Sequence, residues 1–78
     1  MKIENINIGD PVVYIPKHLL GGDKDKMVQD ENLGIVKSKN DSFVFVMYKG
    51  GEGRGVATRS EDLYTLKNRP DLLEKLGL

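Results

Sequence analysis

The residues that could perform catalysis or bind a metal are few in this chain. It contains no cysteine and one histidine, His18, which excludes thiolate nucleophiles and cysteine metal ligands. No serine or acidic residue forms a recognisable catalytic triad or metal-binding motif with His18. We therefore expect a surface histidine and a protein that is not an enzyme.

An acidic stretch at 23–31 is the next candidate for a metal site. Its acids are Asp23, Asp25, Asp30 and Glu31. A calcium-binding EF-hand loop needs glycine at its sixth position, but the sixth residue counted from Asp23 is Val28. The pattern predicts a solvated loop, with no metal site and no cofactor.

The glycine-rich segment 50–55 resembles a phosphate-binding loop only in composition. Such a loop connects a strand to a helix and is usually followed by Gly-Lys-Ser or Gly-Lys-Thr. Here the next residues, 56–58, favour a strand. We interpret the segment as a hairpin turn.

The charges balance over the whole chain, with 12 basic and 12 acidic residues. The centre is locally basic, because five cations there face only Asp41 and Glu52. These cations are Lys37, Lys39, Lys49, Arg54 and Arg59. They are the candidate contacts for RNA or DNA, but zero net charge provides no overall field that attracts nucleic acid. Nucleic-acid binding is therefore the alternative, and a solvated sheet surface is favoured.

The elements that would position these residues are mainly short strands. Runs of β-branched and aromatic residues predict strands at 12–15, 33–39, 43–48, 56–58 and 64–66. Residues 40–42 form a hairpin turn signal, and Ser60 is expected to cap a single helical turn over 60–63. Pro70 and Gly77 bracket a short helix at 70–76. Residues 17–32 are expected to form a long loop.

A chain of 78 residues is expected to form one domain, 1–78, with a barrel at 8–66 and a helical tail at 67–78. Five short strands with a helical turn before the last predict an all-β fold, a small SH3-like five-stranded barrel with a short C-terminal helix. No apolar run approaches the ~18 residues of a membrane span. Together with the absence of cysteine, this predicts a cytoplasmic protein without a membrane partner.

Four strings carry a resemblance to a known class of proteins. They are GDPVVYIP at 9–16, GIVKS at 34–38, FVFVMY at 43–48 and SEDL at 60–63. Together they resemble small SH3-like β-barrels, which include many short, uncharacterised bacteriophage proteins. The resemblance implies the fold over 8–66 and a phage or mobile-element origin. It transfers no functional residue, and the aromatic cage of chromatin readers is not evident.

The strand at 43–48 is apolar on both faces. Val44, Val46 and Tyr48 alternate with Phe43, Phe45 and Met47. On the preceding strand, Val36 is expected to join the first set and Ile35 the second. In the same way, Val12 and Tyr14 are expected to face inward, and Val13 and Ile15 outward.

A domain this small has little material to cover two apolar faces. The tail helix and the long loop could cover the second face, or another molecule could, and both covers could coexist. The second possibility predicts a protein-interaction module, binding a host component or a second copy of itself. Its contact residues would be Ile35, Phe43, Phe45 and Met47. Binding of a small ligand between the long loop and residues 50–55 is a third possibility.

Overall fold

A computed structural model describes residues 2–16, 28–51 and 53–78 of the chain. Its elements are η1 (Ile3–Asn5), β1 (Pro11–Tyr14), η4 (Asp30–Asn32), β2 (Leu33–Lys39), β3 (Val44–Tyr48), β4 (Gly55–Thr58), η5 (Ser60–Asp62), β5 (Leu63–Thr65) and α1 (Pro70–Lys75), where η denotes a single 3-10 turn. The five predicted strands and the C-terminal helix are confirmed, with ends that agree to within one residue. His18, Asp23, Asp25 and most of the expected long loop lie outside the described residues.

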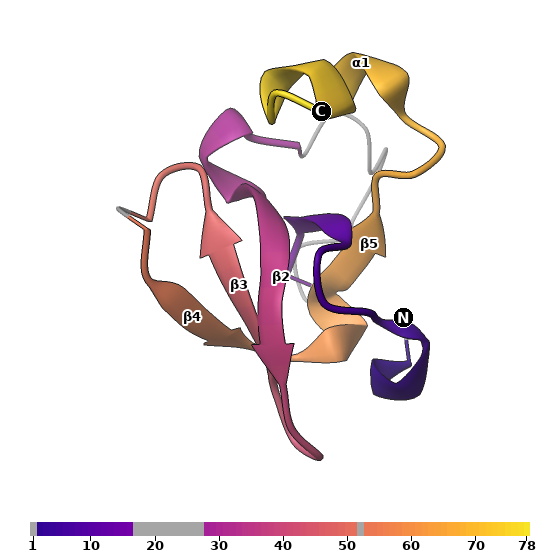
Figure 1. Cartoon of the computed structure of the whole chain (residues 1–78), viewed down its shortest axis with the longest axis vertical. Helices are drawn as coiled ribbons and strands as arrows, with labels where there is room; N and C mark the ends of the chain where they lie inside the picture. Colours follow the sequence, from indigo (N-terminus) through magenta and orange to yellow (C-terminus); the bar gives the residue numbers. More distant parts are fainter. Residues whose placement is uncertain (1, 17–27, 52) are drawn as a thin grey trace.

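The strands form one antiparallel sheet in the order β4-β3-β2-β1-β5. The last strand returns to pair with the first, so β1 lies between β2 and β5 (Figure 1). Strands β4 and β5 are the two edges, and among the described strands the sheet is not closed. The prediction of a mostly β domain with a short terminal helix is confirmed.

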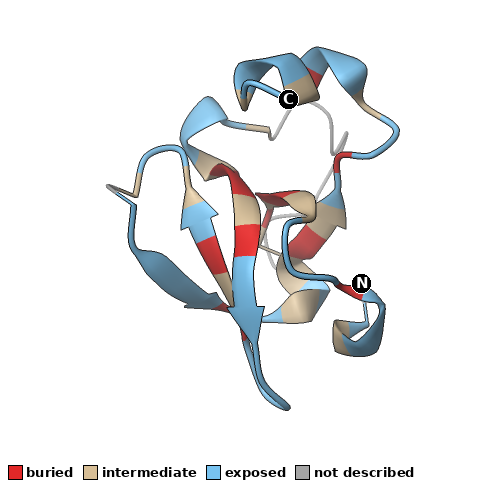
Figure 2. Ribbon diagram, viewed as in Figure 1, coloured by how far each residue is buried: buried red, intermediate tan, exposed pale blue. Residues whose placement is uncertain are grey.

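One face of the sheet carries the first core cluster. Its buried residues are Ile6, Val12, Val36, Val44, Val46 and Leu63, and Ile3, Tyr14 and Tyr48 pack against them. These are the side chains that strand alternation predicted to face inward, with Ile3, Ile6 and Leu63 added. Figure 2 shows the buried residues concentrated in the middle of the sheet.

A register shift in β2 changes the role of Lys39. The shift lies between Val36 and Ser38, and it places Lys39 opposite Val44. The Lys39 ammonium then donates to the carbonyl oxygens of Ile6, at 2.6 Å, and Ile3, at 3.1 Å. These bonds hold the N-terminal segment at the end of the first cluster, where Ile6 is fully buried.

Helix α1 covers part of the other face. The second cluster contains Val13, Ile15, Leu33, Leu66 and Leu72, with Leu73 and Leu76 packed against it. Figure 1 shows α1 at the end of the molecule where β2 begins and β5 ends. Val13 and Ile15 do lie on the second face, and the expected cover by the chain's own tail is confirmed for this part.

Local sequence sets the limits of α1, and docking stabilises it. Pro70 occupies the first turn, Asp71 bonds to Arg69, and Gly77 follows the helix with a φ of 77°. A helix of six residues is not stable alone in water, so α1 depends on the buried Leu72. Lys75 adds an ion pair of 2.8 Å to Asp30 and lowers the pKa of that carboxyl.

The expected cap at Ser60 is wrong. Arg59 is the N-cap residue of η5 and makes no side-chain capping bond, and Ser60 is the first residue of the turn itself. The turn is closed by the backbone N–H of Asp62, which donates to the Arg59 carbonyl at 3.0 Å.

Replacing Leu72 with alanine should lower the free energy of unfolding by about 2–4 kcal/mol, because its side chain is 5% exposed and would leave a cavity. Lys75→Ala should have a much smaller effect, since both partners of its ion pair are well exposed. Urea unfolding of both variants measures this. Equal effects would contradict a helix held mainly by Leu72.

Candidate functional site

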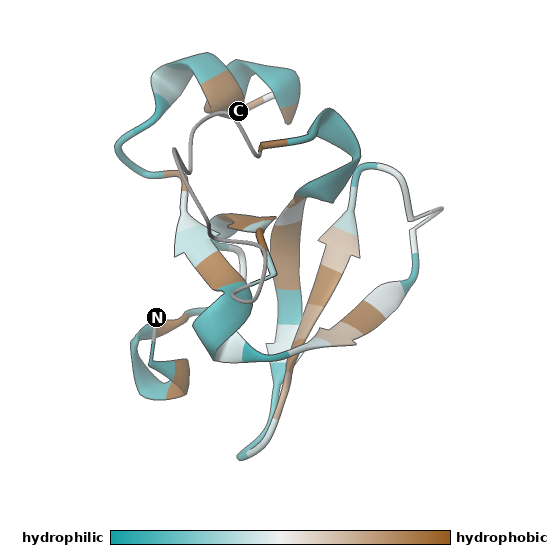
Figure 3. Ribbon diagram, turned by 180° about the vertical axis from the view of Figure 1, so that it is seen from behind, coloured by the Kyte–Doolittle hydropathy of each residue, from teal (hydrophilic) through white to brown (hydrophobic). Residues whose placement is uncertain are grey.

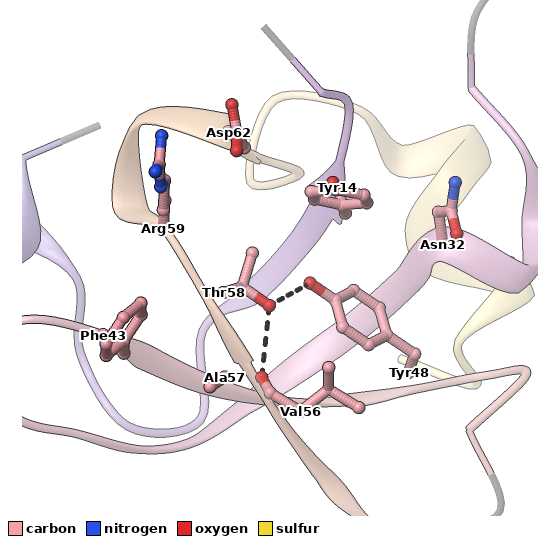
Figure 4. Close-up of a pocket in the computed structure, with 9 residues that line it drawn as sticks. All are labelled: Tyr14, Asn32, Phe43, Tyr48, Val56, Ala57, Thr58, Arg59 and Asp62. Carbon is pink, nitrogen blue, oxygen red and sulfur yellow. Dashed lines mark hydrogen bonds between the residues drawn. The ribbon is translucent and has the colours of Figure 1, made fainter.

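A groove lies between the first core cluster, the edge strand β4 and the turn η5. Its volume is about 620 Å³. The lining residues are Tyr14, Asn32, Phe43, Tyr48, Val56, Ala57, Thr58, Arg59 and Asp62 (Figure 4). They come from β1, η4, β3, β4, η5 and the residues that adjoin these elements, so the groove exists only when the sheet is assembled.

A chain of hydrogen bonds fixes the floor of the groove. The Tyr48 hydroxyl lies 2.7 Å from the Thr58 hydroxyl, which donates to the Val56 carbonyl at 3.1 Å. Because a threonine hydroxyl has one proton, Tyr48 must donate to Thr58. The Tyr14 ring meets the Tyr48 ring edge to face, with centroids 6.2 Å apart. The Tyr48 ring is therefore held by the Thr58 hydroxyl at one end and by contact with the Tyr14 ring.

The groove is amphipathic and carries little net charge. Burial raises the pKa of Tyr48 to about 12, so its phenol is neutral at physiological pH. Asp62 and Arg59 have opposite charges, and Arg59 is also paired with Glu61 at 3.3 Å. Aromatic walls with a few polar groups suit a partner's apolar side chain and adjacent backbone.

A second hollow lies where α1 ends beside β2 and β3. Its volume is about 410 Å³, and its lining is Ile35, Met47, Tyr48, Lys49, Gly53, Lys75 and Leu76. Leu76 thus reaches one end of the apolar surface that the sequence predicted on the central hairpin. Helix α1 does not cover the whole of that surface, since Met47 is still 40% exposed.

The four predicted contact residues do not form one continuous lining. Ile35 and Met47 meet in the second hollow, whereas Phe43 lines the groove. Phe43 precedes β3, and the Asn40 side chain accepts its backbone N–H at 2.8 Å, so strand alternation does not govern Phe43. Phe45 is half-buried and lines neither cavity.

The five candidate cations have different surroundings. The Lys39 ammonium is bonded to backbone carbonyls, and Arg59 is paired with Glu61. Lys49 lines the second hollow, and Arg54 is exposed immediately before β4. Lys37 and Phe45 both approach Gly55, as expected for side chains on the same face.

The groove could not be predicted from the sequence, because its walls come from segments that are far apart along the chain. Tyr14, Thr58 and Asp62 each fit an ordinary strand or turn when the sequence is considered alone. The available signal was the presence of Tyr14 and Tyr48 at inward positions of two predicted strands. In the part of the chain that the structure describes, no group of three or more histidine, cysteine or acidic residues is placed to hold a metal ion.

Comparison with known proteins gives no match: no family model, curated protein or solved structure matches this chain. Within the three described ranges, no helix is long and apolar enough to cross a membrane. Function must therefore be argued from the groove, the second hollow and the exposed strands.

Replacing Tyr48 with phenylalanine should cost about 1 kcal/mol of stability, because the Thr58 hydroxyl loses its donor. It should also change the alkaline response. The raised pKa of Tyr48 contributes stability that is present below about pH 10 and is lost as the pH rises towards 12. Urea unfolding between pH 8 and 12 should show a smaller loss in Tyr48→Phe than in the wild type. Parallel curves would contradict the buried, neutral phenol.

Proposed function

We propose that this protein is a non-enzymatic protein-interaction module built on a small SH3-like barrel, acting in a phage or mobile element on a host component. One observation carries the proposal: α1 covers the sheet beside β1 and β5, while β3 and β4 keep exposed apolar side chains. Phe43 is 42% exposed, Met47 is 40% exposed and Val56 is 44% exposed. Figure 3 shows apolar residues continuing from β2 and β3 onto β4.

The order of the elements supports the SH3-like assignment. A 3-10 turn separates β4 from β5, and β5 returns to pair with β1. This arrangement fits the barrel class that the sequence resembles, although the sheet remains open between β4 and β5. The phage origin has the sequence resemblance as its support.

The exposed apolar residues lie on neighbouring strands and line recessed surfaces. Phe43 and Val56 border the groove, and Met47 borders the second hollow. Single exposed apolar residues are ordinary, but several beside a shaped cavity are typical of an interaction surface. A partner bound over the groove would shield Phe43 and Val56 from water, and contact at the second hollow, on the opposite face, would shield Met47.

The charges favour a protein partner over a nucleic acid. Phosphate binding needs several free cations on one side, and the net charge is zero. Lys39 already donates to two carbonyl groups within the fold. The chemistry that remains at the hairpin is mainly apolar.

The test compares serine substitutions at exposed apolar sites that line a cavity with one at an exposed apolar site that does not. Phe43→Ser with Met47→Ser should abolish retention of a specific protein from a bacterial lysate while changing the free energy of unfolding by about 1 kcal/mol or less, because both side chains are well exposed. Ile8→Ser is the matched control, since Ile8 is 68% exposed and lines neither cavity.

Retention on immobilised protein, identified by mass spectrometry, provides the measurement, and light scattering reports self-association. Loss in the double variant together with retention by Ile8→Ser supports the proposal. A monomer that retains no protein, or one whose partner is held equally by all variants, contradicts it.

A further inference from the structure

Strand β4 has a free edge whose outward backbone groups can be identified. Across β2 and β3, the N–H of Lys49 donates to the Leu33 carbonyl at 2.7 Å. The backbone groups of Lys49 therefore point towards β2. Along a strand, residues whose N–H and C=O groups point to one neighbour alternate with residues whose groups point to the other, so those of Val46 and Tyr48 point towards β4. Val56 lies opposite Val46, so the N–H and C=O groups of Val56 point towards β3 and pair with it.

By the same alternation, the N–H and C=O groups of Gly55 and Ala57 point away from the sheet. No described residue provides a backbone partner for them. Figure 1 shows β4 at the margin of the described chain, with no helix or strand on its outer side.

Among the described residues, β4 is short but lacks other features that prevent strand addition. Proteins protect exposed edges with proline, inward charges, bulges or a covering segment. The sequence of β4 is Gly-Val-Ala-Thr, which contains no proline and no charge, and its register with β3 is regular. An extended chain can therefore pair with Gly55 and Ala57 without displacing anything in the described structure.

The groove lies beside this edge on the face of Val56 and Thr58. Side chains of an added strand would alternate between the two faces of the sheet. Those opposite Val56 and Thr58 would enter the groove, towards Phe43 and Tyr48 (Figure 4). The geometry suits apolar residues at two alternate positions of the added strand.

The charges around β4 indicate an acidic segment. Arg54 and Arg59 flank the strand, and the Arg59 side chain is 71% exposed even with its partner Glu61. Lys37 approaches Gly55 on the other face. A second copy fits less well, because pairing Gly55 with Ala57 of the other copy gathers Arg54 of one copy and Arg59 of the other at each end of the seam.

We propose that the partner protein contributes an extended acidic segment, which adds to β4 as an antiparallel strand. Its backbone pairs with Gly55 and Ala57, two alternate apolar side chains occupy the groove, and acidic residues on either side meet Arg54 and Arg59. This inference rests on the proposed function and names the partner chemistry.

The probe is a fluorescent peptide with valine at its third and fifth positions, serine between them and two glutamates at each end. Binding is followed by anisotropy. Ala57→Pro removes an outward N–H but no bond to β3, so the sheet should remain intact. We expect this variant to bind about tenfold more weakly, as loss of one such hydrogen bond implies. Ala57→Val keeps the N–H and should bind within about twofold of wild type.

Reversal of charge is an independent second test, which remains informative if Ala57→Pro reduces stability. Arg54→Glu with Arg59→Glu should weaken the glutamate peptide and favour its lysine counterpart. Amide exchange at Gly55 and Ala57 should slow when the wild type binds the peptide. Failure of the wild type to bind at about 1 mM peptide, or equal binding by Ala57→Pro and Ala57→Val, would overturn strand addition.

The proposed function is judged separately by the lysate experiment. A partner that is lost in the Phe43 and Met47 variant but is held equally by Ala57→Pro would leave the interaction module standing. That result would show that the partner binds the apolar surface without adding a strand.

Discussion

The packing of Leu72 against the sheet decides which apolar residues contact water. Leu72 joins a cluster with Val13, Ile15 and Leu66, and this contact holds α1 over the β1 and β5 side. A helix of six residues cannot also reach the far side of the sheet. On this second face Met47 of β3 therefore stays 40% exposed, and the edge of β4 is uncovered by the described chain. The second hollow marks the limit of the helix, where Leu76 meets Met47.

The surface that remains combines aromatic walls with a few polar groups. These are a neutral phenol, a buried hydroxyl, an arginine that is paired with Glu61, and the side chains of Asn32 and Asp62. The groove and the edge of β4 adjoin each other, so one extended segment could use both. The structure accordingly supports recognition of backbone and apolar side chains more strongly than phosphate binding.

Features encoded by neighbouring residues were predictable from sequence. β-branched runs defined the strands, and Pro70 and Gly77 defined the helix. Features that depend on long-range pairing were not. The register shift in β2 directs Lys39 to the N-terminal segment, which is why Lys39 is part of the fold and Ile6 is buried. Phe43 leaves the expected face because the Asn40 side chain binds its backbone. The groove could not be located before β1, β4 and η5 were brought together.

Because the chain contains no cysteine, single introduced thiols can test directly whether α1 covers only part of the second face of the sheet. Single variants Met47→Cys and Val13→Cys place one thiol on each half of the second face, and maleimide labelling under native conditions measures how accessible each thiol is. We expect rapid labelling at position 47 and labelling at position 13 only through unfolding, because Met47 is 40% exposed and Val13 is 3% exposed. Equal protection at both positions would show that the whole second face is covered, and would contradict the exposed Met47 that forms part of the proposed interaction surface.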